Sequence, residues 1–105
     1  MEQVYINTAK VMKALSDPKR LKIVDLLSQG ERCANNIQNS FNVSQPTLSH
    51  DMRVLKEAGV TLERRDGKNI FYTLNEDALS AFLRLLDTVF SVEGTYTSES
   101  ENETE

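Results

Sequence analysis

Two side chains that could take part in nucleophilic or metal chemistry, Cys33 and His50, each occur only once in this sequence of 105 residues. A single cysteine cannot form a disulfide within the chain. A zinc site takes about four nitrogen or sulfur ligands, more than one thiol and one imidazole supply. Cys33 and His50 are also the only plausible nucleophile and base, and no pocket motif accompanies them. We therefore expect no enzyme, no metal site and no cofactor, with thiol modification of Cys33 as a minor alternative to a structural role.

A second group of side chains, polar and cationic, is suited to binding phosphates and base edges of double-stranded DNA. Hydroxyl and amide groups near a helix N-terminus are natural partners for phosphates, and an arginine can pair bidentately with guanine. A turn with three cations in five residues follows at Arg64–Lys68. The candidate DNA-contacting residues are Ser44, Gln45, Thr47, Ser49, His50, Arg53, Arg64, Arg65 and Lys68.

Each of these patterns also has a purely structural explanation. A polar helix face is usually a solvated face, a run such as Arg64–Lys68 is usually a soluble turn, and Ser44 with its neighbours could serve only as a helix cap. Their order along the chain is more specific, because a hairpin directly follows the polar helix. This order favours a DNA-binding protein, and the alternative is a protein-interaction module on the same scaffold.

Two helices are predicted in the first third of the chain. Residues 3–15 show apolar residues at helical spacing. A second helix over 18–28 begins after Asp17, which can cap it, with a proline at the first helical position. This second helix has Leu21, Val24 and Leu27 on one face, and Ile23 and Leu26 widen that face.

Two further helices and a tight connection between them form the predicted helix-turn-helix. A short helix spans about 33–40, and Ser44 is the expected N-cap of a helix that runs to Ala58 and ends at Gly59. A helical wheel for this fourth helix gives an apolar face of Leu48, Met52 and Leu55 and an opposite polar face of Ser49, His50 and Arg53.

Strand-like runs follow at 60–65 and 68–74, separated by Asp66-Gly67, one of the strongest short hairpin signals. A fifth helix is predicted over about 76–91. The predicted fold is therefore mainly α with a small β-hairpin: a winged helix-turn-helix of five helices with the wing between the fourth and fifth.

The fifth helix has an apolar stripe that is too wide for packing on one neighbour. A second buried face against a partner subunit accounts for the width, whereas full burial inside its own small domain is the other explanation. A domain this short is often marginally stable alone, which favours dimerisation. The residues expected at a homodimer interface are Tyr5, Ala9, Met12, Leu79, Phe82, Leu83, Leu86 and Phe90.

The net charge of −4 is unusual for a DNA-binding protein, but its distribution explains it. Five glutamates lie between Glu93 and Glu105 with no Lys or Arg among them, so the rest of the chain carries +1. We expect one folded domain over 1–92 and a disordered acidic tail over 93–105. The sequence has no long apolar run and no signal-peptide pattern, so a cytoplasmic protein without a membrane partner is expected.

Three stretches of the chain resemble the ArsR/SmtB family of transcriptional regulators. They are Ala14–Ile23, Val43–Gly59 and Arg65–Lys68 with the following Tyr72–Leu74, and the resemblance extends over about residues 3–91. It implies a winged helix-turn-helix homodimer whose first and last helices form the interface. It also implies a repressor that binds an imperfect inverted repeat and is released by an inducer.

Carried over position by position, the resemblance directs Gln45, Thr47, Ser49, His50 and Arg53 toward DNA, and Arg65 and Lys68 toward its backbone. The chain departs from the family at the sensing sites. Cys33 matches the first thiol of a Cys-x-Cys pair, but Asn35 stands at the second position. The last helix has no histidine for the other common metal site. A standard metal sensor is therefore not expected, and the inducer stays unknown.

Overall fold

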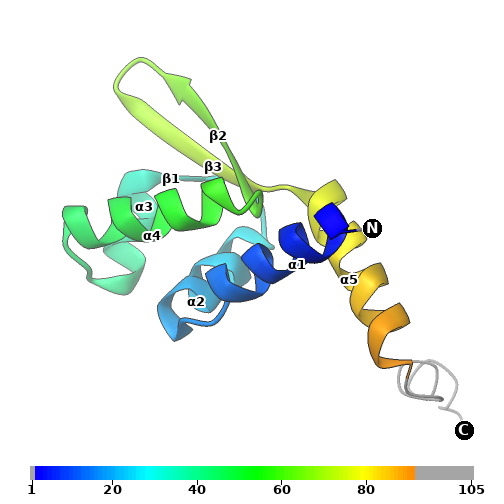
Figure 1. Cartoon of the computed structure of the whole chain (residues 1–105). Helices are drawn as coiled ribbons and strands as arrows, with labels where there is room; N and C mark the ends of the chain where they lie inside the picture. Colours follow the sequence, from blue (N-terminus) through cyan, green and yellow to red (C-terminus); the bar gives the residue numbers. More distant parts are fainter. Residues whose placement is uncertain (1, 92–105) are drawn as a thin grey trace, which may run out of the picture.

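The computed structural model describes residues 2–91 of the chain (Figure 1). Five helices and a small antiparallel sheet follow one another in an order that confirms the predicted fold class. The elements are α1 (Glu2–Ala14), α2 (Pro18–Leu27), β1 (Arg32–Cys33), α3 (Ala34–Phe41), α4 (Gln45–Glu57), β2 (Thr61–Asp66), β3 (Asn69–Leu74) and α5 (Glu76–Phe90). The predicted acidic tail, residues 93–105, lies outside the described residues.

Side-chain caps fix where α2 and α5 begin. The Asp17 carboxylate accepts the Lys19 N–H at 2.8 Å and caps α2. Asn75 accepts the Ala78 N–H at 3.2 Å and caps α5 in the same way. Between α3 and α4, Asn42 has a positive φ of 52°, a conformation that asparagine tolerates better than most residues and that lets the chain turn sharply. These short-range bonds explain why the predicted helix starts lie within a residue or two of the observed ones.

The sheet has the strand order β1-β3-β2, and all its pairs are antiparallel. Strands β2 and β3 form the predicted hairpin, with Asp66 opposite Asn69 and Gly67 at a φ of 62° in the turn. The third strand, β1, was not predicted. It contributes only two residues, which pair with Tyr72 and Phe71, and it places Cys33 immediately before α3 rather than inside the helix.

The core lies between α1, α2, α3, α4 and the base of the hairpin. Ile37, Leu55 and Val60 are its most completely buried side chains. In α2 the buried residues are Ile23 and Leu27, whereas Leu21 is 51% exposed. Val24 and Leu26 also pack against the core, so the predicted apolar face is wrong only at Leu21, which lies at the exposed edge of the stripe.

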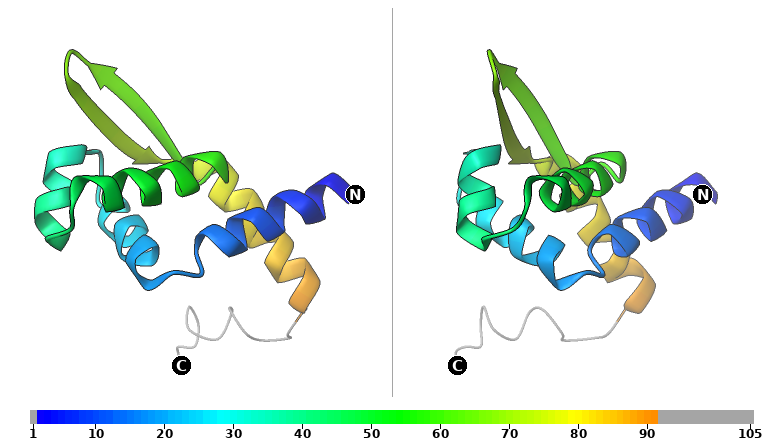
Figure 2. Two further views of the ribbon diagram at one scale, coloured as in Figure 1. Left: turned by 60° about the vertical axis from the view of Figure 1, so that its left-hand side comes forward. Right: turned by 90° about the vertical axis from the view of Figure 1, so that its left-hand side faces the viewer.

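The hairpin stands clear of the helical body, as two further views show (Figure 2). Helices α1 and α5 contact each other at the end of the molecule that lies away from α3 (Figures 1 and 2). Among residues 2–91, none of the helices combines the length and the apolar character needed to cross a membrane.

Candidate nucleic-acid interface

Helix α4 begins with a side-chain cap that uses two of the predicted DNA-contacting residues. The Ser44 hydroxyl accepts the backbone N–H of Thr47 at 3.3 Å and donates to the Thr47 hydroxyl at 3.0 Å. A proline within the first turn suits this start, because its missing N–H would have no partner there anyway. Ser44 is exposed and Thr47 is half-buried. The capping role of Ser44 is thus observed directly, and a further contact with DNA stays a prediction.

The rotation of α4 about its axis agrees with the helical wheel. Leu48, Met52 and Leu55 are between 0% and 4% exposed and face the core. The outward surface, which we call the α4 face, consists of the exposed residues Gln45, Ser49, His50 and Arg53. Two internal bonds order it, from the Gln45 amide to the Ser49 hydroxyl at 2.7 Å and between Arg53 Nη2 and His50 Nδ1 at 3.3 Å.

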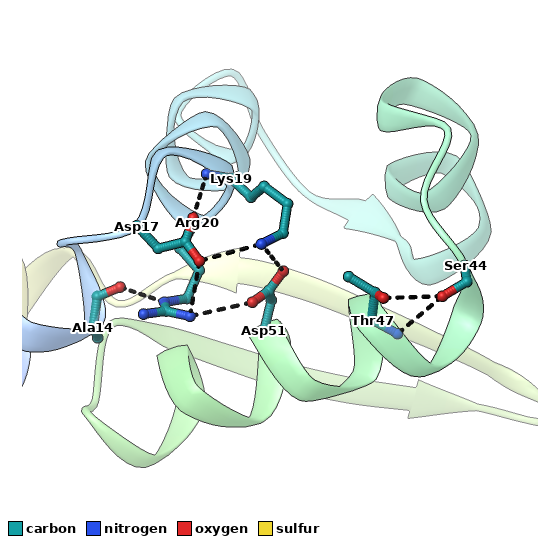
Figure 3. Close-up of polar contacts among 7 residues, drawn as sticks. All are labelled: Ala14, Asp17, Lys19, Arg20, Ser44, Thr47 and Asp51. Carbon is teal, nitrogen blue, oxygen red and sulfur yellow. Dashed lines mark hydrogen bonds and ion pairs between the residues drawn. The ribbon is translucent and has the colours of Figure 1, made fainter.

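A buried carboxylate on α4 holds this face in position (Figure 3). Asp51 is only 3% exposed, and its Oδ1 accepts a hydrogen bond from Arg20 Nη1 at 3.2 Å. Lys19 Nζ lies 3.9 Å from its other oxygen. Asp17 shares both cations, at 3.4 Å from Arg20 and 3.2 Å from Lys19. The two acids and two bases form a cluster without net charge, which limits the cost of removing Asp51 from water.

The same arginine connects α4 to the end of α1. Arg20 Nε donates to the Ala14 carbonyl at 2.6 Å, so one guanidinium bonds to the end of α1, to the cap of α2 and to α4. Bidentate and forked contacts of this kind are what a planar guanidinium provides and a lysine does not. We conclude that the orientation of the α4 face is coupled to α1 and α2 through Arg20.

Sequence reasoning did not identify Asp51 as a positioning residue. The signal was present, because Asp51 lies three residues after Leu48 and four before Leu55, on the apolar side of the wheel. Its partner Arg20 lies 31 positions away in sequence, so their pairing could not be read from local spacing.

The hairpin, which we call the wing, carries the predicted cations in different environments. The Arg65 side chain is 68% exposed, with a guanidinium nitrogen 3.7 Å from Glu63. Lys68 is exposed beside the turn. Arg64 is engaged in a bidentate pair with Glu31, at 2.8 and 3.2 Å, and its guanidinium lies 4.4 Å from the centre of the Phe71 ring. Arg65 and Lys68 are thus more available to a phosphate than Arg64.

The Glu31–Arg64 pair connects the loop before β1 to the middle of the wing. The hydrogen bonds from Arg64 hold the pKa of the Glu31 carboxyl below its ordinary value of 4.5. The same bonds raise the pKa of Arg64. Both side chains are substantially exposed, so the pair contributes more to orientation than to the free energy of folding.

Hollows flank α4 on two sides. One, of about 200 Å³, lies between α3, α4 and the wing and includes Cys33, Gln45, Ser49 and Lys68 in its lining. The other, of about 350 Å³, lies between α1 and α4 and includes His50 in its lining. Cys33 is half-buried. It is the last residue of β1 and directly precedes the first residue of α3. Cys33 and His50 therefore face different hollows on opposite sides of α4.

The residues predicted at a dimer interface lie on α1 and α5, away from the wing (Figure 1). Tyr5 and Met12 are 51% and 47% exposed, and Leu83 and Phe90 are both 61% exposed. Ala9 is also exposed, whereas Leu79, Phe82 and Leu86 are half-buried, with Leu79 and Phe82 packed on the core of their own subunit. Helix α5 has no fully buried residue at all.

Comparison with known proteins agrees with this architecture. Residues 17–60 match the family model described as "Bacterial regulatory protein, arsR family". The transcriptional repressor SdpR of Bacillus subtilis is 46% identical over 69 residues, which cover 66% of this chain and 77% of that protein. The arsenical resistance operon repressor of Staphylococcus xylosus is 41% identical over 85 residues, covering 81% of this chain and 82% of the repressor.

A solved structure shows the same fold. It is the solution NMR structure of a homodimeric winged helix-turn-helix DNA-binding domain from Mycobacterium bovis, described as a possible ArsR-family transcriptional regulator. The TM-score is 0.70 at 31% identity, and the match covers 90% of this chain and 88% of that one. From its fold and its relatives, this chain belongs to the arsR family of bacterial regulatory proteins.

Proposed function

We propose that this protein is a transcriptional repressor that binds an inverted-repeat operator as a homodimer and is released by a signal not yet identified. The observation that carries the proposal is the α4 face. It presents Gln45, Ser49, His50 and Arg53 outward on a helix whose rotation is set by buried leucines and by the buried Asp51. A rigid helix with a polar outer face fits the major groove of B-DNA.

In this proposal the α4 face reads base edges and the wing holds the backbone. Arg53 is the residue best suited to a bidentate contact with guanine, and it would exchange its bond to His50 for that contact. Arg65 and Lys68 would bind phosphates from the wing, where both are exposed. Arg64, already paired with Glu31, would instead fix the angle of the wing.

The homodimer would form through α1 and α5. Both helices expose large apolar residues in the single subunit, and packing them against a partner would remove this apolar area from water. A two-fold dimer would present two copies of α4 to two half-sites, which is why a symmetric operator is part of the proposal.

In this proposal, the signal that releases the repressor is not a metal bound at either of the two metal sites common in the family. The sequence has Asn35 where a second thiol of a Cys-x-Cys pair would stand, and the fifth helix has no histidine. Cys33 lines the same hollow as Gln45 and Ser49, so modification of this thiol would change the surroundings of these two residues of the α4 face. A structural role for Cys33 in β1 is the simpler alternative.

The test is a titration of the purified protein onto the DNA upstream of its own gene at two salt concentrations, with Arg53→Ala in parallel. We expect tight binding that weakens with salt and a loss of about 1–3 kcal/mol in Arg53→Ala on the operator. Weak binding that is indifferent to sequence and to Arg53 would refute the repressor and favour the protein-interaction module.

A further inference from the structure

The hollow between α1 and α4 has several basic side chains along its lining. Lys10 and Lys13 of α1 line one side, His50 and Glu57 of α4 line the other, and Arg20 completes it. The hollow is open, with a volume of about 350 Å³. It adjoins the α4 face directly, because His50 belongs to both. We call it the α1 groove.

The charges in the α1 groove are not balanced within the described part of the chain. The Arg20 guanidinium is occupied by Asp17, Asp51 and the Ala14 carbonyl. Lys10 and Lys13 are exposed and form no ion pair with any residue in 2–91. Among residues 2–91, Glu57 is the only carboxylate in the lining, and it is not paired with either lysine. Two free ammonium groups therefore face one carboxylate, which favours an anionic occupant.

The position of the α1 groove identifies the kind of anion. Successive residues of a helix are rotated by about 100°, so Gln45 and Ser49 lie on the side of α4 toward the wing, and His50 and Val54 lie on the side toward α1. The two hollows agree with this geometry, because the wing-side one includes Ser49 and the α1 groove includes Val54. A helix in the major groove has a phosphate backbone on each side, since the groove is only about 12 Å wide.

We propose that Lys10 and Lys13 bind the phosphodiester backbone that borders the major groove on the side opposite the wing. This inference rests on the proposed function, and it extends the DNA-contacting surface from α4 and the wing onto α1. The wing cations Arg65 and Lys68 hold one backbone, and the α1 lysines hold the other. Helix α1 also carries the exposed Tyr5 and Met12 of the proposed dimer interface, so these phosphates lie toward the centre of the operator.

The experiment compares the salt dependence of DNA binding for the full chain and its variants. Wild type, Lys10→Gln/Lys13→Gln and Lys10→Arg/Lys13→Arg are titrated onto the upstream DNA and onto a non-specific duplex, at several salt concentrations. Each lost phosphate contact lowers the slope of log K against log salt by about 0.9. For four lysines in a dimer, we expect the slope of the glutamine variant to fall by roughly 3–4 on both DNAs.

The affinity should fall with the slope. We expect the glutamine variant to bind both DNAs at least about tenfold more weakly at moderate salt, by the same factor for each, since phosphates carry no sequence information. The arginine variant, which keeps both charges, should bind like wild type. Glu57→Gln, which removes the only carboxylate of the α1 groove, should strengthen binding to both DNAs by about two- to fivefold.

Several outcomes would overturn the inference. An unchanged slope in Lys10→Gln/Lys13→Gln, with Arg53→Ala still defective, would show that α1 does not contact the backbone although the repressor function holds. If wild type itself shows no salt-sensitive binding, the proposed function fails and the inference fails with it. Inorganic pyrophosphate could also shift the NMR signals of Lys10 and Lys13 while the glutamine variant keeps the slope of wild type on DNA. This result would assign the α1 groove to a free anion instead. If the double variant fails to fold, Glu57→Gln alone is the test. An affinity of Glu57→Gln for DNA equal to that of wild type would then contradict the inference.

Discussion

Helices α4 and α5 are similar in length, 13 and 15 residues, but they are held in opposite ways. Helix α4 has four buried residues, including the carboxylate of Asp51. Helix α5 has none, although it is the more apolar of the two. The apolar content of a helix therefore does not determine how firmly its own subunit holds it. Helix α4 is fixed by its own subunit, whereas we propose that the apolar surface of α5 packs against a second one.

The largest expected effect comes from removing a core contact of α4. Leu55 is completely buried, so Leu55→Ala should lower the free energy of unfolding by about 2–5 kcal/mol. Leu62→Ala is the matched control, because Leu62 is 52% exposed and should change stability by less than about 0.5 kcal/mol. Urea unfolding measures both. Equal effects of the two variants would contradict the burial of α4.

The second prediction concerns the charge cluster that orients α4. Asp51→Ala leaves Arg20 partly buried without its main partner and should lower the free energy of unfolding by about 2–3 kcal/mol. This expected loss of unfolding free energy is smaller than that for breaking a fully buried ion pair, because Lys19 and Asp17 are more exposed. The control is Asp25→Ala, at an exposed position on α2 outside the cluster. Stability equal to that of Asp25→Ala would show that the cluster does not hold α4.

A third prediction tests the other side of the comparison. Leu83→Asp, on the exposed surface of α5, should weaken dimerisation by at least about tenfold, because a charge would be buried in the interface. Sedimentation equilibrium measures the dissociation constant, and Leu62→Asp provides a matched change away from α1 and α5. If Leu83→Asp dimerises like wild type, the exposed apolar surface of α5 is not the interface.

The smallest effect is expected in the wing, which an exposed ion pair holds rather than a buried one. Since the pKa of Glu31 is lowered by Arg64, the pair is fully formed above the ordinary value of 4.5 and is lost as pH falls through the lower folded value. The NMR signal of Arg64 Nε should change in that acid range only. In Glu31→Gln the transition should disappear, and its persistence would assign the titration to another carboxyl group.

Much of the fold could be predicted because its signals are local. The caps at Asp17 and Ser44 and the turn at Asp66-Gly67 depend on bonds between residues close in sequence. Strand β1 could not be predicted, because its two residues are strands only through pairing with Tyr72 and Phe71, about forty positions later. The exposure of Leu21 could not be predicted for a related reason: the apolar stripe of α2 is wide, and contacts with α4 and β3 determine which part of it is buried.

The candidate site was predictable only in part. The outward residues of α4 followed from the helical wheel, since Ser49, His50 and Arg53 are exposed as expected. The pairing of Arg64 with Glu31 did not follow from the sequence, because the two residues lie 33 positions apart. Nor did the α1 groove, which forms where α1 meets α4 and which no single stretch of sequence describes. Periodicity predicts which way a side chain points, and only the packed structure determines what it meets.

The most direct test of the central claim, that α4 contacts DNA while α1 and α5 form the dimer, is a hydroxyl-radical footprint on the upstream DNA. Wild type should protect two half-sites related by a two-fold axis, with centres separated by about one helical turn of 10–10.5 base pairs or a multiple of it. Uniform protection along the fragment, or a single protected site without symmetry, would contradict the account.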